Sequence, residues 1–208
     1  MKSFKYIVVA ISLVALISFA VSCKKSQTAL PTFEKSDVPP LHTGNWWRYL
    51  VTDSINNTTD TLTLTIASSA GTAITQTAKC YITRSGNVVD SGYFLLTDTA
   101  LTYQGYNVSQ SLLGSYKLKL PFTTGGSWSF YFAGDDYHVK SYLVSAHILG
   151  NTYTVFDLSR HTIIPDNSTD QHLEIAGGIG LVFEGYTFTG IAGVTQHFGA
   201  QLIDYQLN

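Results

Sequence analysis

The chain has 208 residues, of which 45% are apolar, 13% aromatic and only 12% charged, and its net charge is −2. This balance excludes a nucleic-acid-binding protein, which needs a surplus of basic residues, and a disordered chain, which needs high charge and few aromatics. Two cysteines are too few for a scaffold held by disulfides.

The first predicted element is an export signal at residues 1–22. Lys2 and Lys5 precede an apolar run at residues 6–21, which is shorter than the ~20 residues of a membrane-spanning helix and fits a secretory signal peptide. The run ends in Ala-Val-Ser-Cys, which resembles the lipobox of bacterial lipoproteins with Ala20 in the usual place of Leu. The resemblance implies cleavage before Cys23 and acyl chains such as palmitate on the new terminus, which would anchor the protein in a membrane. The alternative is an ordinary signal peptide or an uncleaved anchor.

Residues 23–41 are predicted to hold the lipidated Cys23 and an extended tether. They contain three of the five prolines and show no apolar periodicity. Lys24 and Lys25 follow Cys23, whereas acidic residues at this place accompany export to the cell surface in Bacteroidetes-type bacteria. We therefore expect an outer-membrane protein that faces the periplasm.

Residues 42–208 are predicted to form a single β domain. Apolar and polar residues alternate strictly at residues 61–66, 116–120 and 128–132, and Gly- or Asn-rich turns separate such runs. Short connections favour an antiparallel meander of about ten strands. Residues 92–96 and 181–188 are apolar on both faces, which favours a strongly curved sheet or open barrel; the alternative is a two-sheet β-sandwich. The one stretch with helical character is residues 109–113.

Three motifs resemble those of small envelope lipoproteins of Bacteroidetes-type bacteria. They are Gly-Asn-Trp-Trp-Arg-Tyr at residues 44–49, Pro-Phe-Thr-Thr-Gly-Gly-Ser-Trp at residues 121–128, and Ala-Gly-Gly-Ile-Gly-Leu-Val at residues 176–182. The resemblance implies an all-β envelope protein and supplies no catalytic residues.

No catalytic, cofactor or metal motif emerges from the spacing of reactive residues. Cys80 lies on the apolar side of a predicted strand and is expected to be a core residue. None of the six His has a metal-binding spacing; the nearest cluster is His138 beside Asp135 and Asp136 at a turn. The Gly-rich segments lack the complete nucleophile-elbow and dinucleotide-binding patterns. We predict neither a cofactor nor a metal.

Two sets of polar residues keep other chemistries open. Four carboxylates lie in or beside predicted strands and would support hydrolysis only if two of them faced each other across a cleft, namely Asp157, Glu174, Glu184 and Asp204. His172 and Glu174 share a strand face; the two alternatives are a neighbouring polar pair and an ordinary exposed pair, of which the second is favoured. Three Asp-[Ser/Thr]-apolar or small triplets resemble the O-glycosylation pattern of Bacteroidetes secreted proteins and make acceptors of Ser54, Thr61 and Thr99.

Aromatic side chains are the remaining candidates for a binding site. Trp46 points away from Trp47 in an alternating strand, while Tyr103 and Tyr106 flank a glycine. We therefore predict an anchored, non-enzymatic module that binds a small ligand, apolar or glycan, or another envelope protein. The alternatives are a glycan or ester hydrolase and a purely structural lipoprotein. The partners expected are the membrane, through Cys23, and this ligand or protein.

Overall fold

The computed structural model describes residues 29–54, 57–107, 112–132, 135–164, 167–189 and 195–208. The chain divides into two compact units, Met1–Leu30 and Pro31–Asn208, and every described strand belongs to the second. The predicted export signal and Cys23 lie outside the described residues. No helix among the residues described has the length and apolar character to cross a bilayer.

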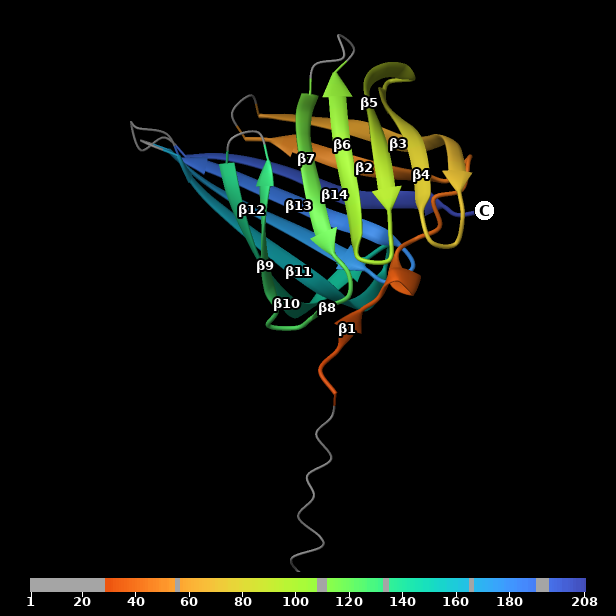
Figure 1. Cartoon of the computed structure of the whole chain (residues 1–208). Helices are drawn as coiled ribbons and strands as arrows, with labels where there is room; N and C mark the ends of the chain where they lie inside the picture. Colours follow the sequence, from red (N-terminus) through yellow and green to blue (C-terminus); the bar gives the residue numbers. More distant parts are fainter. Residues whose placement is uncertain (1–28, 55–56, 108–111, 133–134, 165–166, 190–194) are drawn as a thin grey trace, which may run out of the picture. The chain divides into compact units, whose positions relative to one another are not determined.

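Twelve antiparallel strands form one continuous sheet, so the prediction of an all-β, strongly curved meander is confirmed and the sandwich is not adopted (Figure 1). The strands are β2 (Trp46–Asp53), β3 (Thr58–Gly71), β4 (Gln76–Arg84), β5 (Asn87–Leu96), β6 (Ala100–Asn107), β7 (Leu112–Lys119), β9 (Ser127–Phe132), β10 (Asp135–Ile148), β11 (Asn151–Ile164), β12 (Asn167–Ala176), β13 (Gly180–Thr189) and β14 (Thr195–Gln206). Strands β2 to β7 pair in sequence order, as do β9 to β14, and β2 also pairs with β14, which joins the two halves of the meander.

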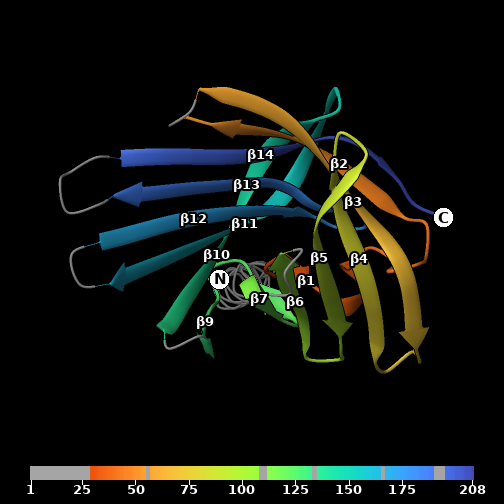
Figure 2. The ribbon, with the colours of Figure 1, turned by 90° about the horizontal axis from the view of Figure 1, so that it is seen from above.

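The sheet curls until its two edge strands, β7 and β9, come close together (Figure 2). Irregularities in register, such as those beside Ile66 in β3 and Leu202 in β14, add local bend and twist. Trp128 of β9 donates its Nε1–H to the carbonyl oxygen of Lys117 in β7 at 3.2 Å. The described residues of β7 and β9 form no backbone ladder with each other, so the barrel stays open between these two strands.

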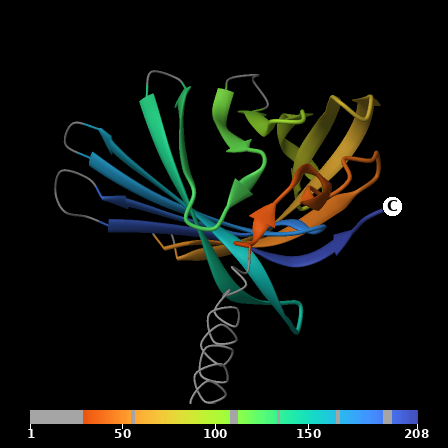
Figure 3. The same ribbon diagram turned by 60° about the horizontal axis from the view of Figure 1, so that its bottom comes forward.

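Residues 31–41 do not form the extended tether that the sequence predicts. This segment, the N-terminal strap, contains β1 (Thr32–Phe33) and the short 3-10 helix η1 (Lys35–Asp37), and β1 pairs with β8 (Phe122–Thr123) at one end of the sheet (Figure 3). Phe33 is only 2% exposed, and its ring stacks on Phe122 at 5.1 Å. The apolar residues of the strap follow neither helical nor strand periodicity, which is why the pattern concealed their burial.

The three motifs that carry the family resemblance gather around the strap. Asn45 donates its Nδ2–H to the carbonyl oxygen of Pro40 at 2.6 Å. The backbone N–H of Gly178 donates to the carbonyl oxygen of Asp37 at 2.8 Å. From the motif at residues 121–128, Phe122 supplies the ring that stacks on Phe33 of the strap. These short sequences therefore secure the N-terminal strap to the sheet.

The helix predicted at residues 109–113 is wrong where the structure describes it, because Leu112 begins β7 and pairs with Tyr106. Residues 109–111 lie outside the described part. The pairing of Leu112 with Tyr106 in the sheet outweighs the weak helical preference of a few residues.

Cys80 is 0% exposed in β4, as predicted for a core residue, and burial raises the pKa of its thiol to about 12. Since the thiolate is the reactive form, we expect iodoacetamide to leave Cys80 unmodified in the folded protein and to alkylate it after unfolding. Mass spectrometry of the peptide that contains Cys80 measures this directly. Alkylation of the native protein at pH 8 at the rate found in denaturant would contradict the burial.

Candidate functional site

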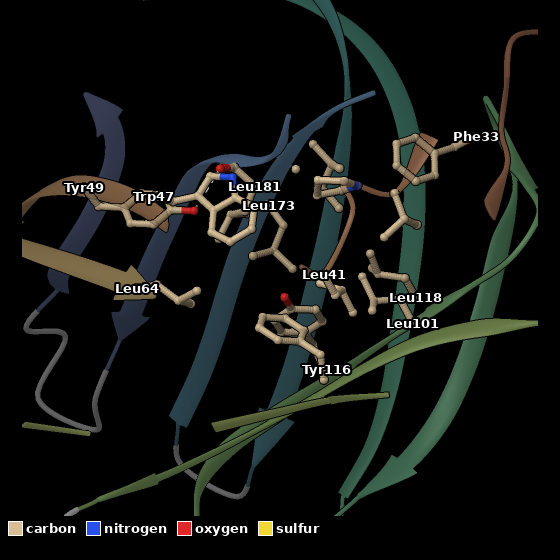
Figure 4. Close-up of a pocket in the computed structure, with 15 residues that line it drawn as sticks. Phe33, Leu41, Trp47, Tyr49, Leu64, Leu101, Tyr116, Leu118, Leu173 and Leu181 are labelled. Atoms are coloured by element: carbon tan, nitrogen blue, oxygen red, sulfur yellow. Dashed lines mark hydrogen bonds between the residues drawn. The ribbon is translucent and has the colours of Figure 1, made fainter. Parts of the chain in front are cut away.

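The concave side of the sheet holds three adjoining hollows, which we call the inner, middle and outer hollows of the central cavity. The inner hollow, about 70 Å³, lies between the strap and the sheet (Figure 4). The middle hollow, about 150 Å³, shares with it the side chains of Tyr49, Leu64 and Tyr116, among others. The outer hollow, about 390 Å³, adjoins the middle one at Val51 and Glu184. Ligand pockets typically measure roughly 300–1,000 Å³, a range that the outer hollow reaches by itself.

Most residues that line the cavity reach it because side chains along a strand alternate between the two faces of the sheet. Trp47, Tyr49 and Val51 of β2 point to the concave side, as do Leu62 and Leu64 of β3. Successive side chains of a strand alternate between the two faces, so each strand contributes every second residue. The alternation read from the sequence therefore predicts which residues face inward, but not that space remains between them.

A row of glycines makes room for Tyr103 on the concave face. Gly92 pairs with Gly105, and Gly105 pairs with Gly114, across strands β5, β6 and β7. The ring of Tyr103 lies over Gly92 and Gly105, so a Cβ atom built on Gly92 would come within 2.6 Å of it. Tyr103 also stacks on Tyr116 at 5.3 Å. The flat, side-chain-free surface thus carries an aromatic wall of the middle hollow.

Glu184 is the acidic residue of the cavity lining, at the junction of the middle and outer hollows. Gln171 donates its Nε2–H to Glu184 Oε1. Burial raises the pKa of the Glu184 carboxyl, while the hydrogen bond from Gln171 and the charge of Arg160 act in the opposite direction. Glu184, with Gln171 hydrogen-bonded to it and the charge of Arg160 near enough to act on it, therefore adds a carboxyl group to a lining that is otherwise largely apolar.

Three tyrosines carry their hydroxyl groups into the same region. Burial raises the pKa values of Tyr49, Tyr103 and Tyr116. Nearby charges, among them that of Glu184, raise these pKa values further. Tyr49 donates its hydroxyl proton to the carbonyl oxygen of Leu181 at 3.1 Å. These phenols are neutral across the physiological range and act as hydrogen-bonding groups inside an apolar wall.

The raised pKa of Glu184 predicts a pH dependence of stability. Below the unfolded-state value of 4.5 the carboxyl is protonated in both states, and as pH rises through the higher folded-state pKa the buried group must ionise at a cost. We therefore expect the free energy of unfolding of the wild type to fall relative to that of Glu184→Gln between pH 4 and pH 8. Urea titrations of both proteins across this range measure the difference, and a constant difference would contradict the prediction.

The predicted aromatic candidates do not form one site. Tyr103 lines the middle hollow, whereas Trp46 lies on the opposite face of β2 from Trp47, beneath the guanidinium of Arg48 at 5.0 Å from its ring. Tyr106 contacts Tyr93, with 6.0 Å between ring centroids, away from the cavity. The structure therefore keeps Tyr103 as a cavity residue and separates it from the other two.

The four carboxylates do not converge either. Glu184 faces the cavity, while Asp157 and Glu174 are register partners on the convex face, in a groove of about 580 Å³. Oδ2 of Asp204 in β14 lies 3.6 Å from a guanidinium nitrogen of Arg48 in β2. Asp157 and Glu174 stand side by side on one surface and do not oppose each other across a cleft, the arrangement that glycoside hydrolysis needs.

His172 and Glu174 are neighbours on one face of β12, since the charge of His172 acts on the Glu174 carboxyl, and His172 also meets Asp157. His172 Nδ1 lies 3.2 Å from Asp157 Oδ1, diagonally across two strands. Burial and the neighbouring Asp157 raise the pKa of the Glu174 carboxyl.

His138 and the proposed sugar acceptors occupy ordinary strand and turn positions. His138 Nδ1 lies 2.7 Å from Ser129 Oγ, and no group of three or more potential metal ligands is present in the described parts of the chain. Ser54 and Thr99 are exposed at turns, while Thr61 is half-buried within β3. Glycosylation at these three residues stays a prediction.

Sequence reasoning missed the pairing of Gln171 with Glu184 and the placement of Arg160. One signal was present: Glu184 is a single charged residue within a stretch that is apolar on both faces, residues 181–188. Since such a residue is buried only when it is partnered, it marks a polar cluster in the core. Gln171 and Arg160 became visible only through the cross-strand register.

No protein-family model and no curated protein matches the chain. Two solved structures resemble it in fold, each with a TM-score of 0.49: a protein of Parabacteroides distasonis provisionally designated a lipoprotein, and a protein of Bacteroides fragilis provisionally designated exported and YmcC-like in fold. Identities are 11% and 7%, over 81% and 82% of this chain and 97% and 99% of theirs. Neither likeness extends to particular residues or to an activity.

Proposed function

We propose that this protein is an envelope lipoprotein that binds a small apolar ligand in the central cavity and catalyses no reaction on it. The apolar and aromatic lining of the three adjoining hollows is the observation that carries the proposal. Concave, mostly apolar pockets with a few polar groups are the usual form of small-molecule sites. An apolar ligand suits such walls better than a glycan, whose hydroxyl groups would lose their hydrogen bonds to water.

The position of Ala200 offers a direct test of the binding site. Ala200 lies in β14 at the junction of the middle and outer hollows, while its neighbour Gln201 is exposed on the other face. We expect the mature chain with Cys23→Ser, free of acyl chains and detergent, to bind the fluorescent probe N-phenyl-1-naphthylamine at one saturable site. Ala200→Phe should abolish this binding by filling the junction.

Gln201→Phe is the matched control, because it places the same ring on the opposite face of the same strand. It should bind the probe as the wild type does, and both variants should keep their cooperative unfolding transitions. Equal binding by Ala200→Phe and Gln201→Phe would exclude the central cavity as the site and would favour the structural role.

The proposed anchor is a lipidated Cys23 in the outer membrane, with the folded domain in the periplasm. The small residues before Cys23 and the basic residues after it support this placement. Mass spectrometry of the N-terminal peptide from isolated outer membranes should find acyl chains on Cys23 as the first residue. A chain that begins elsewhere, or an unmodified Cys23, would refute the anchor without affecting the cavity.

A further inference from the structure

The three hollows of the central cavity follow one another along the strands. In β13, Leu181 borders the inner and middle hollows, Glu184 borders the middle and outer hollows, and Tyr186 borders the outer hollow. In β2, Tyr49 and Val51 follow the same order. The volumes fall in one direction, from about 390 Å³ in the outer hollow to about 150 Å³ in the middle one and about 70 Å³ in the inner one. The central cavity therefore narrows toward the strap.

The outer hollow is the open and polar end of the cavity. The carboxyl group of Glu184 and the imidazole ring of His197 belong to its lining. Tyr186 and Phe198, which also border it, are exposed. A ligand can therefore enter at this end and keep a polar group in contact with water or with these side chains.

The inner hollow is the closed and apolar end. Phe33 and Leu41 of the strap line it and are both buried, and none of the described residues that line it carries a charge. The Nε1–H of Trp47 and the hydroxyl group of Tyr49, which also belong to its lining, already donate to backbone carbonyl oxygens. Since an unpaired polar group is costly to bury, this end of the cavity suits a hydrocarbon group.

The strap fixes the depth of the inner hollow. Pro39 packs so closely on Gly180 that a Cβ atom built on Gly180 would lie 3.0 Å from Pro39 Cγ. Val38 and Leu41, both buried, line the inner hollow from either side of Pro39 along the chain. The size of these two side chains therefore decides how far a ligand can extend into the closed end.

We propose that the central cavity takes a single-chain amphiphile, with its polar end in the outer hollow and its hydrocarbon tail in the middle and inner hollows, and that Val38 and Leu41 limit the length of the tail. The narrowing favours one flexible chain over two chains or fused rings, which a tightly packed interior would not admit at the inner end. This inference rests on the proposed function, because it names the ligand class of the same cavity.

The length of the tail follows from the strand that borders all three hollows. Gly180 and Glu184 are four residues apart in β13, which corresponds to about 13 Å along a strand and to an extended tail of about ten carbon atoms. Gly180 borders the inner hollow, and Glu184 marks the junction of the middle and outer hollows. A tail of this length therefore reaches from the polar end to the strap.

A series of straight-chain alcohols from 1-hexanol to 1-tetradecanol tests the limit on the mature chain with Cys23→Ser, by displacement of N-phenyl-1-naphthylamine. We expect the dissociation constant to fall roughly fourfold for each added methylene group while the tail still fits, as expected for burial of a methylene group. It should stop falling near 1-decanol or 1-dodecanol, when the tail meets the strap. A dissociation constant that keeps falling through 1-tetradecanol would overturn the limit.

A pair of isomers tests the preference for one chain. The alcohols 1-dodecanol and 2-butyl-1-octanol have the same formula, but the branch shortens the tail of the second and widens it. We expect 1-dodecanol to displace the probe at roughly tenfold lower concentration, because its tail alone fills the inner hollow. Equal or stronger displacement by the branched isomer would exclude the single-chain ligand.

Two variants of the strap test the residues. Val38→Ala enlarges the inner hollow and should lengthen the limiting tail by about two carbon atoms, whereas Leu41→Phe fills the hollow and should shorten it by about as much. Val88→Ala and Leu95→Phe make the same changes at exposed positions and should keep the wild-type limit. The opposite directions of the two shifts distinguish a limit set by the strap from a general loss of stability.

The outcomes separate this proposal from the proposed function. Absence of saturable probe binding, or binding that Ala200→Phe does not reduce, would refute the cavity as a binding site. Probe binding that Ala200→Phe abolishes, combined with the wild-type limit in both Val38→Ala and Leu41→Phe, would leave the cavity standing and refute the role of the strap.

Discussion

Replacing Phe33 by Ala is expected to lower the free energy of unfolding by about 3–5 kcal/mol, the usual cost of truncating a buried aromatic ring. Phe33 stacks on Phe122 and meets Phe156 edge to face at 5.7 Å. Loss of the ring would open a cavity among two aromatic partners and remove part of the inner hollow's lining. Chemical denaturation followed by tryptophan fluorescence measures the change.

Phe198→Ala is the matched control for this prediction. It removes the same ring from a position that is 45% exposed, where truncation costs about 1 kcal/mol or less. If Phe33→Ala proved no more harmful than Phe198→Ala, residues 31–41 would be the loose tether that the sequence predicts, and the strap would not belong to the folded body.

Trp47→Ala is expected to cost about 3–5 kcal/mol as well, for a different reason. Trp47 is 5% exposed and donates its Nε1–H to the carbonyl oxygen of Ile179 at 2.7 Å, linking β2 to the turn before β13. Trp47→Phe keeps most of the apolar volume but orphans this buried carbonyl group, which alone costs about 1–3 kcal/mol. The two variants separate packing from hydrogen bonding in the same denaturation experiment.

The adjacent Trp46 provides the control. Its Nε1–H donates to the side chain of Gln206 at 3.2 Å on the exposed face of the sheet, where water can replace the bond. Trp46→Phe should therefore change stability by less than about 0.5 kcal/mol. A similar loss for Trp46→Phe and Trp47→Phe would contradict the assignment of opposite faces to the two tryptophans.

The strap links the predicted anchor to the cavity. Phe33, Val38 and Leu41 lie on the chain just after Cys23, and they line the inner hollow. Lys35 secures the strap from the side through its Nζ, 2.6 Å from Asp98 Oδ1. Residues of the N-terminal strap therefore form one wall of the proposed binding site.

The strands, and which of their side chains point toward the core, could be predicted from the sequence because both depend on a single strand. The alternation at residues 61–66 assigns Leu62 and Leu64 to the core whatever strand lies beside them. The same holds for Cys80, whose burial needs only an apolar face. Curvature was accessible too, since residues 181–188 are apolar on both faces and need cover on both.

The candidate site was accessible only in part. Tyr103 was predicted as a binding residue and lines the cavity. Trp46 and Tyr106 were predicted with it, but Trp46 lies on the opposite face of β2 from the cavity and Tyr106 packs against Tyr93 away from the cavity. The carboxylates Asp157 and Glu184 lie on strands of one sheet yet on its two different faces. No single strand carries the information that decides which of these residues meet.

The sequence by itself determined an all-β chain, an export signal pattern and the inward set of apolar residues, because composition and period-two alternation act within a few neighbouring residues. Only the tertiary structure decided that β2 pairs with β14, that the strap packs at the end of the sheet, and that Gln171 meets Glu184. The physical reason is that these contacts join distant segments, and their strength depends on how far the sheet curls. The central cavity is the space that remains on the concave side of the curled sheet.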